Sequence, residues 1–308
     1  MAFGSSSAKP VFVRRTGIGA AKIVAVNPTM KQINDAFGRE LFTQEQQYVR
    51  DVEYDGKKFK SVDVTFLLKF DPEIKENNGY SDLHFLTFRL QNRVLANSDE
   101  NNPKVQVIDE YGRTAWVTTK EYESREIPVY KNGPARISKN YRGCYRGEEN
   151  LIKFIAALRC VPDIDVWNKT TQKWEINPRE EPDNCKKEIT IEDLKKIFAG
   201  DFSPVRSWIE GYENSIVKVL LGVRTGEDGR KYSVIYDGAF LNQYQRSTTQ
   251  LTRALSEDVA RGRYGDTVFK IGPLIDCESV VPDDLSKPVS TSVASKSDFD
   301  PLDDLPFS

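Results

Sequence analysis

The run Ser61-Val-Asp-Val-Thr-Phe-Leu-Leu-Lys-Phe70 alternates between apolar and polar side chains along most of its length. Successive side chains of a β-strand point to opposite faces, so a period of two predicts a strand with one face in the core. The apolar face is Val62, Val64, Phe66, Leu68 and Phe70, and the polar face is Asp63, Thr65 and Lys69. We therefore expect this strand to have one buried and one solvated face.

Similar patterns on both sides of this run predict more β-structure. In residues 83–91, Leu86, Phe88 and Leu90 are predicted to point inward. Residues 104–109 and 113–118 flank Glu110-Tyr-Gly112, which predicts a hairpin. Residues 214–225 and 230–237, joined by Gly226-Glu-Asp-Gly229, predict a second hairpin, and residues 22–26 a further strand.

Helices are predicted between these strands. Asn27 is expected to cap a helix that has Pro28 at its first position and is stopped by Gly38 after Phe37. Apolar spacing predicts a helix over 148–159, and further helices are expected over about 190–200, 203–210 and 247–260. Residues 161–189 are rich in Pro, Asp, Asn, Lys and Glu, which predicts a surface insertion.

The order of these elements predicts an α+β fold that is mainly β. A Greek-key barrel of the OB type with helical insertions fits the order, and a generic α+β domain fits it nearly as well. We expect a flexible N-terminal extension over 1–16, a DNA-binding domain over 17–281 with an insertion near 161–213, and a disordered acidic tail over 282–308.

Composition places the chain among soluble globular proteins. Of its 308 residues, 39% are hydrophobic and 29% charged, and no apolar run approaches the roughly 20 residues that a membrane span needs. The N-terminus has no apolar signal core, so we expect no secretion and no membrane partner. The net charge is −2, but the tail after residue 281 holds six Asp and two Lys, which leaves 42 basic and 40 acidic residues in the body.

The sequence offers little for metal or enzyme chemistry. Cys144, Cys160, Cys185 and Cys277 lack metal-ligand spacing, and His84 is the only histidine and lies on a predicted core face. No Ser/His/Asp arrangement is identifiable, so we expect no enzyme, no cofactor and no metal. A two-metal nuclease built from scattered Asp and Glu residues remains an alternative.

Residues 127–146 are unusually basic and aromatic. This segment contains no acidic residue, whereas acidic residues outnumber basic ones in the chain. Its cations suit phosphates and its rings suit stacked bases, as single-stranded nucleic acid requires. A solvated basic loop is the alternative. The candidate DNA-binding residues of this segment are Tyr130, Lys131, Arg136, Lys139, Tyr141, Arg142, Tyr145 and Arg146.

The outward sides of the predicted strands add further candidates. Phe85, Arg89 and Trp116 lie on these predicted polar sides, where exposed rings would form a stacking platform. The alternative is a second layer that covers this face. A second basic stretch could extend the groove, and its residues are Arg246, Arg253, Arg261 and Arg263.

The last eleven residues hold four aspartates and an apolar tip. Clustered carboxylates and proline disfavour packed structure, so we expect this tail to be exposed. Its candidate partner-binding residues are Asp300, Asp303, Asp304, Leu305, Pro306 and Phe307.

Two parts of the chain resemble known families. The tail resembles those of bacterial and phage single-stranded DNA-binding proteins, where an Asp-rich run ending in Pro-Phe docks replication partners. Residues 216–243, which end in Tyr236-Asp-Gly-Ala-Phe-Leu-Asn-Gln243, are similar to the end of the core in phage helix-destabilising, T4-type single-stranded DNA-binding proteins. The resemblance covers about a tenth of the chain besides the tail, and the zinc module of that family has no counterpart here.

This resemblance implies an OB-fold cleft and sequence-independent binding of single-stranded DNA. It also implies a role in phage DNA replication, recombination and repair, in the cytoplasm of an infected bacterial host. Replication and recombination proteins would then bind the tail, and the protein would self-associate on DNA. The alternative is a phage structural or interaction protein without affinity for single-stranded DNA.

Overall fold

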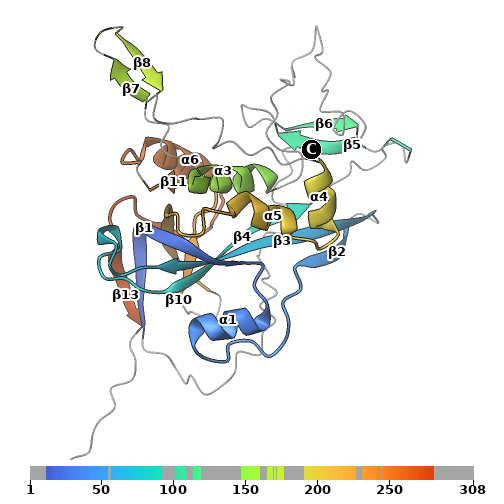
Figure 1. Ribbon diagram of the computed structural model, residues 1–308, viewed down its shortest axis with the longest axis horizontal. Coiled ribbons are helices and arrows are strands. Elements are labelled where there is room, and N and C mark those ends of the chain that lie inside the picture. Colours follow the sequence, from blue (N-terminus) through green and yellow to red (C-terminus); the bar gives the residue numbers. More distant parts are fainter. Residues whose placement is uncertain are drawn as a thin grey trace, which may run out of the picture.

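One antiparallel sheet of nine strands organises the chain in the computed structural model (Figure 1). The structure describes residues 12–54, 57–91, 101–102, 104–108, 114–118, 147–159, 165–168, 170, 172–176, 191–226, 231–243 and 245–280. Within this part, strands hold more residues than helices, so the prediction of a mainly β protein is confirmed.

The sheet runs in the order β10-β9-β1-β3-β2, and β4 pairs with β3. Its short strands β11 and β12 pair with β9, and β13 pairs with β1. The strands are β1 (Phe12–Val26), β2 (Val49–Tyr54), β3 (Lys57–Phe70), β4 (Leu83–Gln91), β9 (Val217–Thr225), β10 (Lys231–Ile235), β11 (Leu241–Asn242), β12 (Val268–Phe269) and β13 (Ile275–Val280).

β1 is three times as long as the predicted strand over 22–26. Its first residues pair with β13, its middle with β9 and its end with β3. The strand therefore includes residues 12–16, which the sequence suggested as the end of a flexible leader. These residues gain their partner from a segment more than 250 positions away, which no local pattern reveals.

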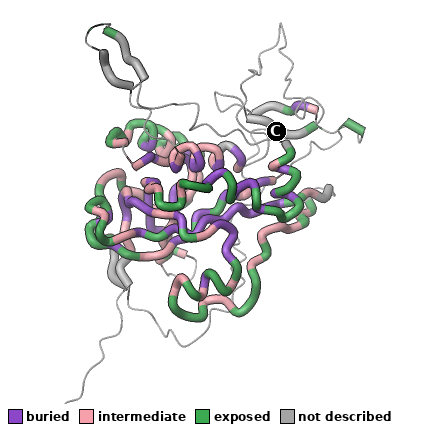
Figure 2. The backbone as a smooth tube through the Cα atoms, viewed as in Figure 1, coloured by how far each residue is buried: buried purple, intermediate pink, exposed green. Residues whose placement is uncertain are grey.

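In Figure 1, α1 (Met30–Phe37) lies on one side of the sheet, and α3, α4, α5 and α6 (Thr249–Ala260) lie on the other. Of these, α3 (Glu148–Arg159), α4 (Ile191–Phe198) and α5 (Ser203–Ile209) pack into the main core. Their apolar side chains join those of β3 and β4 in one core, where the rings of Phe154 and Phe66 are 4.7 Å apart. Buried residues follow the strands and the sheet-facing sides of these helices (Figure 2).

The predicted apolar face of β3 is confirmed, since Val62, Val64 and Phe66 are fully buried. The prediction that the other face is solvated is wrong for most of the strand. Asp63 is only 9% exposed and Leu67 is fully buried. Phe37 and Phe42, from the segment around α1, pack on Phe85, which is directly opposite Leu67 on β4, so this segment supplies the covering layer that is the alternative from the sequence.

The start of α1 differs from the prediction. Thr29, rather than Asn27, caps the helix, and its hydroxyl accepts the Gln32 N–H in a capping box. Asn27 instead has φ 44 and uses its side chain to bind β3, so it is not available as a cap. The predicted stop is confirmed, since Gly38 ends the helix at φ 64.

Two predicted hairpins and one predicted helix agree with the structure. Both predicted hairpins form, as β5–β6 and β9–β10, and α3 has the predicted bounds. A further hairpin, β7–β8, lies within the predicted insertion. The elements not yet bounded are η1 (Lys75–Asn77), β5 (Lys104–Ile108), β6 (Thr114–Thr118), β7 (Asp165–Asn168) and β8 (Lys173–Ile176).

Candidate nucleic-acid interface

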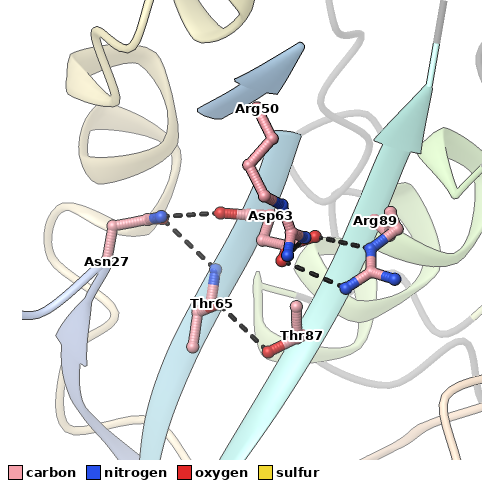
Figure 3. A network of polar contacts seen from close by, with 6 residues as sticks. All are labelled: Asn27, Arg50, Asp63, Thr65, Thr87 and Arg89. Atoms are coloured by element: carbon pink, nitrogen blue, oxygen red, sulfur yellow. Dashed lines mark hydrogen bonds and ion pairs between the residues drawn. The ribbon is translucent and has the colours of Figure 1, made fainter. Parts of the chain in front are cut away.

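A carboxylate lies between two guanidinium groups on the face of β2, β3 and β4 that points away from the main core (Figure 3). Asp63 on β3 is directly opposite Arg89 on β4. The Arg89 Nε donates to Asp63 Oδ1 at 2.8 Å and Nη2 to Oδ2 at 3.2 Å. Arg50 on β2 donates from Nη2 to Oδ2 at 2.5 Å. One carboxylate therefore orients both arginines.

The polar row continues along the sheet and is held by further hydrogen bonds (Figure 3). The hydroxyls of Thr65 and Thr87 are 3.0 Å apart. The Asn27 amide donates to the Asp63 carbonyl at 2.7 Å and accepts the Thr65 N–H at 3.2 Å. These hydrogen bonds tie β3 to β4 and to Asn27, at the end of β1.

Phe85 adds an aromatic ring to the same face of β4. Side chains at 85, 87 and 89 share a face, so Phe85 lies about 13 Å along the strand from Arg89. The ring is 37% exposed. It stacks on Phe37 at 6.1 Å and meets the edge of Phe42 at 6.4 Å. The prediction of an outward ring is therefore confirmed, although neighbouring rings cover part of it.

The chemistry of this face suits an anion. Two guanidiniums share one carboxylate, and all three groups are only partly exposed. Charges in such positions are screened less than fully solvated ones. Guanidinium also matches the geometry of phosphate oxygens better than a lysine does.

Trp116 lies in a different sheet from Phe85 and Arg89. It is 38% exposed, while the next residue, Val117, is buried in the main core, so its predicted outward direction is confirmed. However, β6 pairs with β5 alone in a two-stranded sheet. The structure therefore does not bring Trp116 onto the face that carries Arg89.

The predicted basic segment lies outside the described residues, as does the tail. The segment residues are Tyr130, Lys131, Arg136, Lys139, Tyr141, Arg142, Tyr145 and Arg146. The tail residues are Asp300, Asp303, Asp304, Leu305, Pro306 and Phe307. The basic segment joins the described chain at Gly147, which has φ 85 and lies so close to the Arg89 carbonyl that a Cβ would overlap it.

The second basic stretch has a mainly structural role where the structure describes it. Arg263 donates to Asp258 at 3.0 Å, and Arg253 pairs with Glu257 on the surface of α6. Arg246 and Arg261 are exposed. Only Arg246 and Arg261 are therefore exposed cations of the kind that an extended DNA-binding groove would need.

The Tyr236–Gln243 motif packs α6 against the sheet. The Tyr236 hydroxyl donates to the buried Asp258 at 2.7 Å, and burial raises the pKa of Tyr236 well above its usual range. Phe240 packs on Phe154 in the main core. The motif therefore acts as a structural joint between the sheet and α6.

His84 is buried, as its predicted core position requires. Its Nε2 lies 2.7 Å from the Tyr80 hydroxyl, and burial lowers the pKa of the imidazole. Asp82 raises this pKa and Arg14 lowers it, both to a smaller extent.

Two residues of this ionic cluster do not follow from the sequence. β2 alternates too weakly to predict a strand that carries Arg50, and the alternation of residues 61–70 predicts a solvated Asp63. The charge of Asp63 on the strand opposite Arg89 was the only available signal.

Over the residues that the structure describes, no cluster of three His, Cys, Asp or Glu could hold a metal, and no helix is long and apolar enough to cross a membrane.

Comparisons with known proteins give no further identification. No protein family, no curated protein and no solved structure matches this chain.

Proposed function

We propose that this chain is a non-enzymatic protein that binds single-stranded DNA without sequence preference. In this proposal, the β2–β3–β4 face and the basic segment 127–146 form one surface. Arg50 and Arg89 neutralise phosphates on the face, and Phe85 offers a ring to a base. The tyrosines and cations of the segment extend the same pattern of charge and stacking, which tolerates any base.

The packing of Gly147 against Arg89 is the observation that carries this proposal. It attaches the end of an acid-free, tyrosine-rich segment to the strand that holds Arg89. A Cβ at this position would overlap backbone, so only glycine allows such a close approach. Gly147 therefore connects the basic segment 127–146 to the strand that carries Arg89, two features that the sequence indicated separately.

The shape of the sheet supports an OB-like barrel as the architecture of this surface. β4 pairs with β3, so β9, β1 and β3 separate it from β10 along the sheet, yet some Cα atoms of β4 and β10 are within 8 Å of each other. A sheet that curls in this way approaches closure, as small Greek-key barrels do.

The tail completes the proposal. Asp300, Asp303 and Asp304 would bind a basic pocket on replication or recombination proteins, with Leu305 and Phe307 as apolar anchors. The similarity to T4-type proteins favours a phage protein that acts in replication, recombination and repair. A phage structural protein remains the second candidate, because a partly covered Phe85 also suits protein contacts.

Binding of fluorescein-labelled oligo(dT), followed by anisotropy at several salt concentrations, tests the proposal. Arg89→Gln should reduce the slope of log K against log salt by about 0.7, since one phosphate contact is lost. Phe85→Ala should weaken binding by about 5- to 150-fold, which corresponds to about 1–3 kcal/mol for a stacked base.

Arg253→Gln is the matched control, because it removes the same charge from an exposed helix face. Urea denaturation of each variant would show that the fold is intact. If the chain does not bind oligo(dT) even after removal of residues 298–308, it is a structural or interaction protein instead.

A further inference from the structure

Arg224 on β9 is a half-buried arginine without an acceptor. Its Nε is shielded from solvent and makes no hydrogen bond, and within the described residues its guanidinium makes no ion pair. Native proteins rarely leave a buried charged donor unsatisfied, since the desolvated group then loses its hydrogen bonds to water without replacement. The exception requires an explanation.

Other partly buried arginines of the sheet and helices have partners. Arg15 binds Asp276 at 2.6 Å, and Arg159 binds the Trp208 carbonyl at 2.5 Å. The Nε atoms of Arg14, Arg15 and Arg159 also lack a hydrogen bond of good geometry, but Arg15 and Arg159 have the partners named above, and Arg14 is directly opposite an acidic residue, Glu278, in the β1–β13 register. Arg224 differs from all of these because its neighbours in register carry no charge.

Those neighbours are polar side chains from two adjacent strands. Tyr232 on β10 is directly opposite Arg224 and is 41% exposed. Thr267 precedes Val268, which pairs with Val223, so the register places Thr267 on the other side of Arg224. The Thr267 hydroxyl is itself buried without a hydrogen bond within the described residues. Two unsatisfied donors therefore lie in one row across β9 and β12.

We propose that Arg224 and Thr267 form a binding site for a phosphate-type oxyanion. A guanidinium fork and a hydroxyl provide the donors that tetrahedral oxyanions accept. Asp266, next to Thr267, is exposed and makes no ion pair with Arg224, so this carboxylate does not fill the site. The site is separate from the Arg50–Asp63–Arg89 cluster, and its ligand is either inorganic phosphate or a phosphodiester.

Two measurements on the full chain distinguish these sources. In the first, the melting temperature is followed as phosphate replaces chloride at constant ionic strength. A saturable rise for the wild type that Arg224→Gln abolishes and Arg253→Gln retains supports the site, because only a ligand of the native state stabilises it. Arg224→Lys keeps the charge but not the fork, and should give a weaker rise.

In the second measurement, oligo(dT) affinity is followed against salt. A slope reduced by about 0.7 in Arg224→Gln, but not in Thr225→Ala, identifies a phosphodiester as the ligand. A rise in melting temperature without a slope change identifies free phosphate. If Arg224→Gln responds to phosphate as the wild type does and has an unchanged slope, or if the wild type shows neither effect, the site is refuted. The melting-temperature measurement uses phosphate without DNA, so its result does not depend on the proposed DNA binding.

Discussion

Replacing Asp63 with Asn should destabilise the fold by about 2–3 kcal/mol. The Asp63 side chain is 13% exposed and holds the two guanidiniums at 2.5 and 2.8 Å. Breaking a fully buried pair costs about 3–5 kcal/mol, because the remaining charge is left without a partner. Arg50 and Arg89 are 25% and 29% exposed, so water compensates part of this loss and the estimate is lower.

Urea denaturation at low salt measures this loss directly, with the midpoint falling at an unchanged m-value. Asp51→Asn is the control, since Asp51 is exposed on β2 and should change the free energy of unfolding by less than about 0.5 kcal/mol. Added salt should reduce the deficit of Asp63→Asn, because it screens the repulsion between the arginines. A loss below about 0.5 kcal/mol at low salt would show that the carboxylate does not hold this face together.

Other predictions concern pH and packing. Burial lowers the pKa of His84, the only histidine, so the unfolded chain binds a proton first, and the free energy of unfolding should fall as the pH drops below about 6.5. This fall should be absent between pH 7 and 5.5 in His84→Gln when unfolding is followed in urea. Gly147→Ala should cost about 3 kcal/mol or more, because φ 85 and contact with Arg89 exclude a Cβ; unchanged thermal unfolding would contradict this packing. Tyr236→Phe should cost about 1–2 kcal/mol through its lost bond to Asp258, and a neutral result in urea denaturation would contradict that.

Local sequence patterns predicted those elements in which the spacing of apolar residues by itself determines which face is buried. β3, β4 and α3 follow from alternation or helical spacing, because one face of each packs into the main core. The β9–β10 hairpin follows from its Gly-containing turn. In these cases, neighbouring residues carry enough information to predict both structure and burial.

The remaining features depend on distant partners. β1 extends to Phe12 only because β13 pairs with it, and the outer face of β3 is buried only because the α1 segment packs there. The Asp63–Arg89 pair required the register of β3 and β4, which the sequence does not specify. The sequence thus predicted that basic and aromatic residues form the candidate site. It did not predict the ionic cluster, which depends on how the strands pair.

The salt dependence of oligo(dT) binding is the decisive measurement for DNA binding through the β2–β3–β4 face. We expect log K to fall linearly with log salt, by about 0.7 for each phosphate contact, and Arg89→Gln to lose one such step. Binding that is absent at low salt, or that does not change with salt, would contradict it.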